Sequence, residues 1–590
     1  MHTWMQSALD QTPWAVEIGR PMVFFDELGP LSRVRLDADD SSGLTMRNGQ
    51  ASPPWRRVQL GFALLCRAIR ASIASFVIIR LQVCRAACLA VGVWALHAAD
   101  QPQWGHAWTR NLVSQEKGLP GDFDPATGRN IKWVAKLGTE THSTPVIGSG
   151  RVVIGTNNGS PRDPRHKGDR GVLMCFDEKD GRFCWQLVVP KRTEDIFFDW
   201  PNAGICSAAT IDGKRVYVVS NRSEVMAIDI DGFANGNDGP FVDEGRHMSP
   251  PEEAPLEPGP MDADILWIFD LTTGAGIWAH DAPSSSILVH GSHLYLNTST
   301  GVDNTHKRVR TPEAPSLVVL DKFTGAYLAR DGEPIAPNIF HSTWSPPALA
   351  EVNNQPLIFF AAGNGVLYAF EPLALNAGSA NTPAATAASA ASAPARLKTV
   401  WQFDFDPAAP KTNVHRFNSN RRESPSNFYG MPVFHDGRIY LAGGGDIFWG
   451  KNEAWLKCIN ASVEGNRGAG TELWAYPLVR HTMSTPAVYD GMVFIADCGQ
   501  TLHCVDAETG RGYWKHELRG EIWASPFVAD GKVYLGTRRG QFVVMAATRE
   551  KRVISTIDLG APISSTATAA NGVLYVATMT HLYAISGGPN

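Results

Sequence analysis

The chain has 590 residues, a formal net charge of −5 and 19% charged residues. A nucleic-acid-binding protein needs a concentration of basic residues to neutralise phosphates, and this composition does not supply one. Nucleic acid is therefore excluded as an expected partner. The 55 glycines and 18 tryptophans are typical of a β protein, because tight turns need glycine and half-buried strands favour aromatic residues.

The first part of the chain, residues 1–99, contains a segment of the secretory type. Arg80 and Arg85 precede an apolar stretch that runs from Ala86 to Ala98 and ends in small residues. A signal peptide has this order of basic residues, then apolar residues, then small residues. A retained membrane anchor is the alternative, but arginines interrupt the apolar run and leave it short for a bilayer span. We therefore predict a periplasmic or extracellular protein with no stable membrane span in the mature chain.

One unit of three strands and two turns recurs along the rest of the chain. Each copy has an apolar strand, a tight turn, a strand rich in Val, Tyr and Leu, a polar turn and a third strand. Self-similarity at a period of about 40 residues indicates stacked structural units. Eight copies can be aligned: the fourth starts at Ser345 with a longer turn, and the others turn at Gly150, Gly213, Gly291, Gly437, Gly491, Gly531 and Gly572.

A second signature, Asp followed four residues later by Gly and again by Trp, joins the third strand of a copy to a fourth. The Asp can bond the turn backbone, the Gly accepts a positive φ, and the Trp packs on the neighbouring sheet. Four-stranded units of this size stack radially, so the sequence predicts an all-β, eight-bladed propeller of antiparallel blades. The signature occurs at Asp177/Gly181/Trp185, Asp270/Gly274/Trp278 and Asp506/Gly510/Trp514.

The segment around Trp133 has the pattern of an outer strand but no copy before it, and the last copy ends after Ile585 without a fourth strand. We expect Trp133 to pair with the last blade near Tyr583, which closes the ring between the two ends of the chain. The predicted organisation is an N-terminal extension with the signal-like segment at 1–99, a lead-in at 100–129 and the propeller at 130–590.

The stretch from Asp506 to Trp514, which fits Asp-x-x-Thr-Gly-x-x-x-Trp, resembles the tryptophan-docking repeat of propellers of the pyrroloquinoline-quinone (PQQ) type. The resemblance extends over about residues 130–586. The family includes quinoprotein alcohol dehydrogenases, the propeller lipoprotein of the outer-membrane barrel-assembly machinery and exported bacterial proteins without an assigned activity, which the insertions resemble most. The repeat is specific for the fold and says little about function.

Polar residues recur five positions before the Pro position of the aligned copies. Innermost strands of a propeller start at the mouth of the central channel, so these side chains are expected to converge there. Converging carboxylates and imidazoles could bind a metal or a cationic ligand, and the alternative is a solvated rim. The predicted channel-mouth residues are Glu140, Asp281, His341, Asn427, His481 and Glu521.

Long insertions lengthen the earlier blades but not the last two, and loops on a rigid scaffold often carry function. Phe197, Trp200, Arg421 and Trp449 lie in or near these insertions, where they could line a ligand pocket or only pack the loops onto the propeller. One insertion offers hard oxygen ligands on a flexible turn, which suits calcium, although it lacks the bidentate Glu of an EF-hand and Asp/Asn/Gly runs are ordinary turn formers. Its candidate metal ligands are Asp229, Asp231, Asn235, Asn237 and Asp238.

The hairpin that contains Cys175 and Cys184 turns through Glu178 to Gly181, which would place the two cysteines opposite one another. Opposed positions on antiparallel strands bring Cβ atoms within bridging range, so we predict a disulfide in the exported protein. The alternative is a pair of buried thiols that act as small apolar residues.

These features predict a binding protein that presents a loop-built surface to a protein, peptide or glycan. Two alternatives remain open, an outer-membrane assembly scaffold and a PQQ-dependent alcohol or sugar dehydrogenase. The resemblance implies that such a dehydrogenase holds PQQ with calcium and tryptophan stacking. The adjacent Cys-Cys pair of the alcohol dehydrogenases is absent from the sequence, as is a Cys-x-x-Cys-His haem motif, so PQQ binding is not expected.

Overall fold

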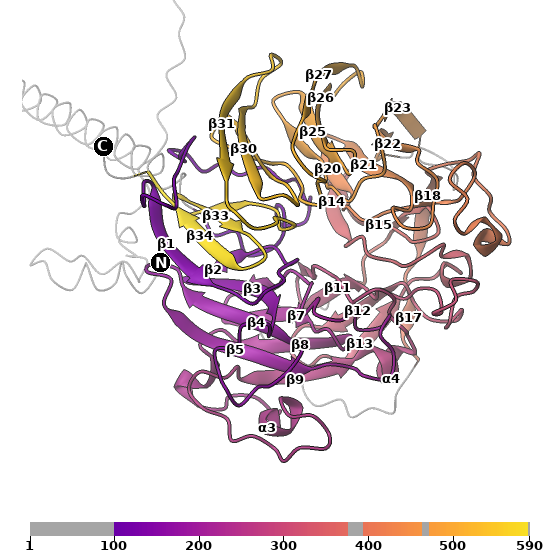
Figure 1. The fold of residues 1–590 in the computed structure, drawn as a ribbon. Coiled ribbons are helices and arrows are strands. Elements are labelled where there is room, and N and C mark those ends of the chain that lie inside the picture. The colour runs from indigo at the N-terminus through magenta and orange to yellow at the C-terminus, as the bar shows by residue number, and fades with distance from the viewer. Residues whose placement is uncertain (1–98, 376–392, 463–470, 588–590) are drawn as a thin grey trace, which may run out of the picture. The chain divides into compact units, whose positions relative to one another are not determined.

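The computed structural model describes residues 99–375, 393–462 and 471–587. The chain divides into a unit of residues 1–88 and a unit of residues 89–590, and the described residues all belong to the second. They form eight antiparallel sheets, each with four strands in sequential order except where the chain ends meet, and the sheets succeed one another around a ring (Figure 1). The predicted eight-bladed propeller is confirmed.

The first four blades follow one another along the chain, each running from the channel outwards. Blade 3 also pairs with β17 (Ala395–Arg396) at its outer edge. The strands are β2 (Val146–Gly148), β3 (Arg151–Asn157), β4 (Arg170–Asp177) and β5 (Phe183–Pro190); β6 (Thr210–Asp212), β7 (Arg215–Val219), β8 (Glu224–Asp229) and β9 (Ile265–Asp270); β10 (Leu288–His290), β11 (His293–Asn297), β12 (Leu317–Asp321) and β13 (Tyr327–Arg330); β14 (Ala348–Val352), β15 (Gln355–Ala361), β16 (Val366–Phe370) and β18 (Thr399–Asp404).

The remaining blades have the same order, and β19 (Ser426–Asn427) extends blade 5 along β21. Short helical turns, η1 (Gly232–Asn235), α3 (Glu244–His247), α4 (Leu271–Ala275), η2 (Ala336–Asn338) and η3 (Val414–Phe417), lie in the loops between the strands. The strands are β20 (Val433–His435), β21 (Arg438–Gly445), β22 (Ala454–Asn460) and β23 (Thr471–Pro477); β24 (Ala487–Tyr489), β25 (Met492–Asp497), β26 (Thr501–Asp506) and β27 (Gly512–Glu517); β28 (Phe527–Ala529), β29 (Lys532–Gly536), β30 (Gln541–Ala546) and β31 (Val553–Asp558); β32 (Thr568–Ala570), β33 (Val573–Ala577), β34 (His581–Ile585) and β1 (Ile131–Lys136).

The ring closes through β1, which pairs antiparallel with β34 and places Val134 opposite Tyr583. Figure 1 shows the indigo strand from the N-terminal side beside the yellow strands of the C-terminal side. The predicted closure is confirmed. The indole Nε1 of Trp133 then donates to Glu178 O of blade 1 at 3.1 Å, so the closing strand also docks on the next blade.

Outer-strand tryptophans dock five of the blades on the turn of the next blade: Trp133, Trp185, Trp267, Trp474 and Trp514. In blade 1, the fully buried Trp185 donates from Nε1 to Ile230 O of blade 2 at 2.9 Å. Glycine is required at the turn that receives such a ring: a Cβ on Gly510, whose φ is +73°, would lie 2.7 Å from Trp474 Cδ2. This repeated contact joins neighbouring sheets across their apolar faces.

One of the predicted turn signatures is wrong. Asp270 ends β9, the fourth strand of blade 2, and its side chain caps α4 by accepting from Thr272 N at 2.8 Å. The tryptophan that docks blade 2 is instead Trp267, within β9 itself. The long insertion between β8 and β9 separates the third strand from the fourth, so the spacing of the shorter blades does not apply here.

The predicted opposition of Cys175 and Cys184 is also wrong. Cys175 pairs with Trp185 and Phe176 with Phe183, because a β-bulge shifts the register at this point and leaves Cys184 as the extra residue. Both thiols are free in the structure. The two side chains remain hydrogen-bonded neighbours, which lowers the pKa of the Cys184 thiol to about 7, whereas burial raises that of Cys175.

The lead-in meets all eight blades, an arrangement that the sequence did not suggest. Its residues between Gln101 and Glu116 bond the innermost strands of blades 1 to 7 in ring order, mostly through a backbone N–H within the strand. In blade 8 they bond the turn that follows the innermost strand. The bonds are Ile147 N to Gln101 O (2.8 Å), Ile211 N to Pro102 O (2.8 Å), Trp108 Nε1 to Val289 O (3.0 Å), Leu349 N to Trp108 O (2.8 Å), Phe434 N to Thr109 O (3.1 Å), Val488 N to Asn111 Oδ1 (2.9 Å), Val528 N to Leu112 O (2.9 Å) and Gly572 N to Glu116 Oε2 (2.6 Å). We call residues 101–116 the inner ring.

Arg110 anchors the inner ring from within. Its side chain is fully buried, and its guanidinium donates to Pro347 O at 2.9 Å, Ser286 O at 2.8 Å and Trp104 O at 3.1 Å. These carbonyls belong to blade 4, blade 3 and the inner ring itself, so one side chain ties three segments together.

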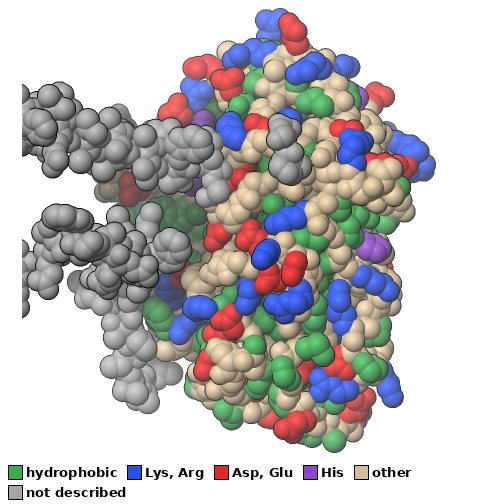
Figure 2. All heavy atoms as spheres, turned by 90° about the vertical axis from the view of Figure 1, so that its left-hand side faces the viewer, with side chains coloured by type: hydrophobic (Ala, Val, Ile, Leu, Met, Phe, Trp, Pro, Cys, Tyr) green, Lys and Arg blue, Asp and Glu red, His purple; other side chains and the backbone are tan. Residues whose placement is uncertain are grey.

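The surface of the propeller carries mixed charge. Figure 2 shows Lys and Arg side chains interspersed with Asp and Glu over the coloured part of one face, which therefore presents no extended field of one sign. Among the residues that the structure describes, no helix is long and apolar enough to cross a membrane.

Candidate functional site

A cavity of about 570 Å³ lies next to the inner ring, at the end of the channel where the innermost strands begin. Trp104 of the inner ring contributes to its wall, and loops of the earlier blades supply most of its aromatic residues. The cavity is lined by Trp104, Glu140, His142, Thr144, Phe197, Trp200, Ala203, Cys206, Ala208, Asp281, Ala282, Ser284, Ser285, His306, Trp344, Tyr429, Phe448, Trp449, Met483, Trp523, Arg538, Ser564 and Thr566.

The aromatic lining is partly exposed and preorganised by stacking. Trp200 is 45% exposed and lies 5.6 Å from Phe197 between ring centroids. On the other side, Trp344 stacks on Tyr429 at 4.9 Å with an interplanar angle of 14°. The Arg538 guanidinium lies 4.3 Å from the Trp523 ring centroid, so this ring is held by a cation–π contact.

Three of the predicted loop residues, Phe197, Trp200 and Trp449, line the cavity. Arg421 does not: its guanidinium donates to Gly450 O at 2.9 Å and Phe448 O at 2.8 Å, which shapes the loop that carries the cavity-lining Phe448.

Two of the predicted channel-mouth residues, Glu140 and Asp281, line the cavity directly. His341 lies behind Asp281, with its Nε2 3.2 Å from Asp281 Oδ2. Glu521 is placed beside the lining residue Arg538, whose backbone N–H donates to its carbonyl at 2.8 Å. The other two are buried: Asn427 Nδ2 lies 3.4 Å from Asp446 Oδ2, and burial and the nearby Arg480 lower the pKa of His481.

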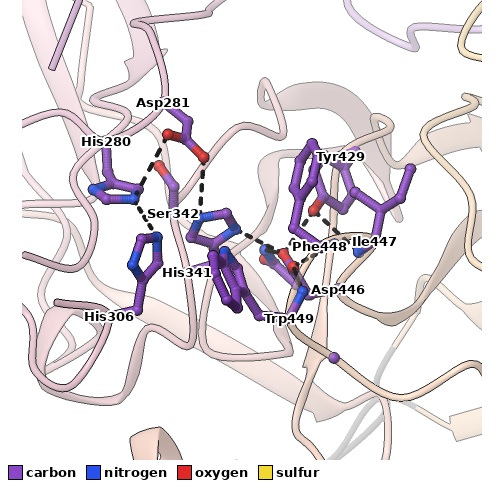
Figure 3. Close-up of polar contacts among 12 residues, drawn as sticks. His280, Asp281, His306, His341, Ser342, Tyr429, Asp446, Ile447, Phe448 and Trp449 are labelled. Atoms are coloured by element: carbon purple, nitrogen blue, oxygen red, sulfur yellow. Dashed lines mark hydrogen bonds and ion pairs between the residues drawn. The ribbon is translucent and has the colours of Figure 1, made fainter. Parts of the chain in front are cut away.

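A network of imidazoles and carboxylates extends from Asp281 into the protein (Figure 3). His280 and His306 face one another with their Nε2 atoms 2.9 Å apart, and His280 Nε2 lies 3.7 Å from Asp281 Oδ1. His341 joins the two carboxylates, since its Nδ1 is 2.9 Å from Asp446 Oδ2. The ligand nitrogens of the three histidines all lie within 4.8 Å of one another, and the side chains are almost completely buried.

Asp446 is held from several sides. It accepts from Tyr429 Oη at 2.6 Å and from the backbone N–H groups of Phe448 at 3.0 Å and Trp449 at 2.8 Å. These bonds and His341 keep the pKa of Asp446 far below its usual range in spite of complete burial. The carboxylate therefore fixes the orientation of the His341 ring.

Burial and nearby charges give the three histidines different pKa values. Burial lowers the pKa of His280 to about 4, so its imidazole is neutral at ordinary pH. Burial acts in the same direction on His341, but Asp446 and Asp281 outweigh it and raise the pKa of His341 to about 9. Burial also lowers the pKa of His306.

The backbone at the network adopts unusual conformations. Asp281, Ala282 and His306 have φ values of +58°, +71° and +56°, in the left-handed region that side chains other than glycine rarely occupy. Such residues persist where the surrounding structure determines them, and they cluster at functional sites. His306 comes from the insertion between β11 and β12, and His280 from the segment between α4 and β10.

The predicted calcium ligands make other contacts. The Asp231 carboxylate pairs with Arg151 at 2.9 Å and Lys214 at 2.7 Å, and Asn235 Nδ2 donates to Asp238 Oδ2 at 2.6 Å. Asn237 Nδ2 donates to Glu244, and Asp229 accepts from the Asp231 N–H. Calcium binding there stays a prediction.

A second group with metal-type side chains consists of Asp163, His166 and Asp262. Its centre already contains a cation: one nitrogen of Arg165 lies 2.6 Å from Asp163 Oδ2 and 3.0 Å from Asp262 Oδ2. The group of His280, His306 and His341 differs in this respect. Among the described residues, the polar contacts printed for its ring nitrogens are to one another and to Asp281 and Asp446, and none is to a lysine or arginine.

Eight blades, docking tryptophans and ring closure define the class as an eight-bladed β-propeller. A family model described as "Outer membrane protein assembly factor BamB" matches residues 101–237 and 459–578, which include the inner ring and the whole of blades 1, 6 and 7. The chain is a propeller repeat protein of the PQQ type.

Among curated proteins, the tetrathionate hydrolase of Acidithiobacillus ferrooxidans is 31% identical over 113 residues, which are 17% of this chain and 23% of that protein. The chain thus matches under a quarter of this relative's length. Among solved structures, BamB from Moraxella catarrhalis has a TM-score of 0.44 at 12% identity and covers 77% of this chain and 96% of its own. The quinohemoprotein alcohol dehydrogenase of Comamonas testosteroni has a TM-score of 0.40 at 13% identity over 83% and 81%.

Proposed function

We propose that the cavity binds a compact ligand and that this ligand is a short glycan, in a protein that is exported. The observation that carries the proposal is the wall itself, in which exposed aromatic faces alternate with a few polar groups inside a volume of about 570 Å³. Ligand cavities usually have volumes of about 300 to 1,000 Å³ and combine aromatic walls with a small number of polar groups.

A sugar ring has an apolar C–H face and hydroxyls at its edge, which matches this wall. Trp200 and Trp344 offer faces for stacking, whereas Glu140 and Asp281 can accept from hydroxyls. The buried Nε1 atoms of Trp104 and Trp523 have no hydrogen-bond partner among the described residues. An unpaired buried donor costs free energy, so a ligand hydroxyl that accepts from it would gain affinity.

The size of the cavity disfavours a folded protein as the occupant of this site, since stable protein interfaces bury about 1,200 to 2,000 Å². A peptide end remains the alternative ligand. An assembly scaffold is the second candidate function, and the family-model match over residues 101–237 and 459–578 favours it. A scaffold would use the outer surface of the blades, so cavity substitutions would leave its partner binding unchanged.

The cavity does not fit PQQ well. PQQ carries three carboxylates, which need cationic partners, but Arg538 is the one Lys or Arg side chain among the described lining residues, and Glu140 and Asp281 add negative charge. A bound anion of this kind would meet repulsion rather than complementarity. We therefore assign no redox chemistry to this site.

Export of the protein is supported by the order of basic, apolar and small residues up to Ala98. Fractionation of cells, with the N-terminal residue of the exported form determined by mass spectrometry, tests this part of the proposal. A form that stays in the cytoplasm at full length would contradict it.

Tryptophan fluorescence tests the ligand. Titration of the protein with neutral disaccharides (cellobiose, maltose and chitobiose) should give saturable quenching with at least one sugar. Trp200→Ala should weaken that binding about 2- to 12-fold, since an aromatic contact contributes about 0.5 to 1.5 kcal/mol. Trp108→Ala is the matched control, because Trp108 is 41% exposed and lies outside the cavity, against 45% for Trp200. Since Trp108 belongs to the inner ring and its Nε1 donates to Val289 O, circular dichroism and thermal unfolding first check that this variant is folded. Failure of all three sugars, or an equal effect of both variants, would contradict the glycan proposal, and quenching by aromatic dipeptides would favour the peptide alternative.

A further inference from the structure

We infer that His280, His306 and His341 bind a divalent transition-metal ion, Zn²⁺, beside the cavity, with Asp281 as a further ligand from the cavity side. This site goes beyond the glycan-binding function and does not depend on it. The inference begins with ligand type, because neutral imidazole nitrogens and a carboxylate oxygen are common ligands of zinc.

The spacing of the nitrogens suits a single ion after small ring rotations. Tetrahedral zinc with bonds of about 2.0 to 2.1 Å places its ligand nitrogens about 3.3 Å apart. Here the Nε2 atoms of His280 and His306 are 2.9 Å apart, and the three ligand nitrogens lie within 4.8 Å of one another. No pair therefore has to move by more than about 1.5 Å to reach tetrahedral separations.

The environment of His341 resembles the outer shell of a metal ligand. A metal-binding histidine usually has its other ring nitrogen hydrogen-bonded to a carboxylate, which sets the ring orientation. His341 Nδ1 has this partner in Asp446, at 2.9 Å. Its Nε2 is buried, is directed at Asp281, and has no aligned hydrogen bond among the described residues. The nitrogen that would bind the ion thus faces the Asp281 carboxylate, the further proposed ligand, at 3.2 Å.

The site is reachable and has a fixed frame. Asp281 and His306 both line the cavity, so an ion can enter from there, and a fourth or fifth position would face the cavity. Trp449 packs on His306 at 4.5 Å between centroids, and Phe197 stacks on His280 at 5.3 Å with an interplanar angle of 9°. Three protein nitrogens with an open position are the arrangement of zinc sites that bind a further ligand.

The test uses the full chain, expressed without a histidine tag and dialysed against EDTA. Calorimetric titration with ZnCl₂ should show one strong site per chain, and Co²⁺ should give the intense visible absorption of a four- or five-coordinate site. His306→Ala should weaken zinc binding at least about 100-fold. Asp446→Asn, which removes a positioning residue, should weaken it about 10- to 100-fold.

His166→Ala is the matched control, because His166 is likewise buried, at 1% exposed against 7% for His306, and belongs to the group that Arg165 already fills. It should leave zinc affinity unchanged. Circular dichroism checks that each variant is folded, and His306→Gln replaces the alanine variant if that one is not. The inference is overturned by less than about 0.1 equivalent of strongly bound zinc, by unchanged affinity in both His306 variants, or by loss of binding in His166→Ala. Weak, six-coordinate Co²⁺ absorption would also overturn it, whatever the variants do. None of these results depends on sugar binding, so failure here and failure of the glycan proposal are distinguishable.

Discussion

Two successive levels of the same channel differ in how their polar groups are used. At the inner ring, residues 101–116 bond backbone groups of seven innermost strands and of the turn after the eighth, and Arg110 is bonded to three carbonyls. At the cavity, the buried Nε1 atoms of Trp104 and Trp523 lack hydrogen-bond partners among the described residues. The first level has the properties of a structural element, and the second those of a binding site.

The difference follows from what each level is made of. The inner ring bonds the innermost strand of seven blades and the turn after it in the eighth, and five of these eight bonds use the backbone of the inner ring. The cavity is built from insertions that differ from blade to blade, and their side chains meet without repeating. Stability and ligand binding should therefore respond to different substitutions, and the following predictions test that separation.

The largest effect is expected from Arg110→Ala, which should lower the free energy of unfolding by at least about 3 kcal/mol. The change leaves three buried carbonyls without donors and creates a cavity at the centre of the ring. Thermal and urea unfolding of the purified variant measure it. Arg182→Ala, at a side chain that is 64% exposed, is the control and should change stability by less than about 0.5 kcal/mol. A similar small effect for Arg110→Ala would mean that the inner ring does not stabilise the propeller.

Zinc binding beside the cavity should have the next largest effect on the free energy of unfolding. An ion that binds only the folded protein raises the free energy of unfolding by about 2.7 kcal/mol at 100 times its dissociation constant. Unfolding with and without zinc should show this gain in the wild type and in Arg182→Ala, but not in His306→Gln. A gain of equal size in His306→Gln would place the stabilising ion elsewhere.

Trp523→Ala should have a smaller effect and only on ligand binding. The ring lines the cavity and carries the unpaired Nε1 donor, so sugar affinity should fall by about 0.5 to 1.5 kcal/mol. Stability should change less than in Arg110→Ala, because the Trp523 ring is partly exposed. A loss of stability as large as that of Arg110→Ala, with sugar affinity retained, would contradict the separation of the two levels.

The smallest effect is expected outside both levels, at Cys184 in blade 1. Its hydrogen bond to Cys175 lowers the pKa of the thiol to about 7, so iodoacetamide should modify Cys184 at neutral pH well before Cys175, whose pKa burial raises. Peptide mass spectrometry of protein taken from an oxidising compartment and from reducing conditions measures both thiols and any disulfide between them. Cys184→Ser should leave zinc and sugar binding unchanged.

The repeat made the blades predictable. Each turn glycine marks a hairpin that is local in sequence, and the outer strand at Trp133 had no other partner than the last blade. The prediction failed where local register departed from the pattern. The bulge at Cys184 shifted one hairpin, and the insertion before β9 moved the docking tryptophan to Trp267.

The site was only partly predictable, because alignment of the repeats can locate only residues that share a register. Asp281 and His341 were found in this way, since each precedes an innermost strand at the same position. His306 and Asp446 lie in insertions of two different blades, and no spacing in the sequence connects them to His341. The inner ring was missed for a related reason, since its bonds are formed mostly by the backbone, which leaves no pattern of side chains to recognise.

Anomalous diffraction at the zinc absorption edge, from crystals of the full chain grown with one equivalent of ZnCl₂, tests the central claim most directly. The account predicts one strong peak at about 2.0 to 2.1 Å from nitrogens of His280, His306 and His341, next to the cavity and absent in His306→Gln crystals. A peak between Asp163 and Asp262, or density at the three histidines with no anomalous signal, would contradict it.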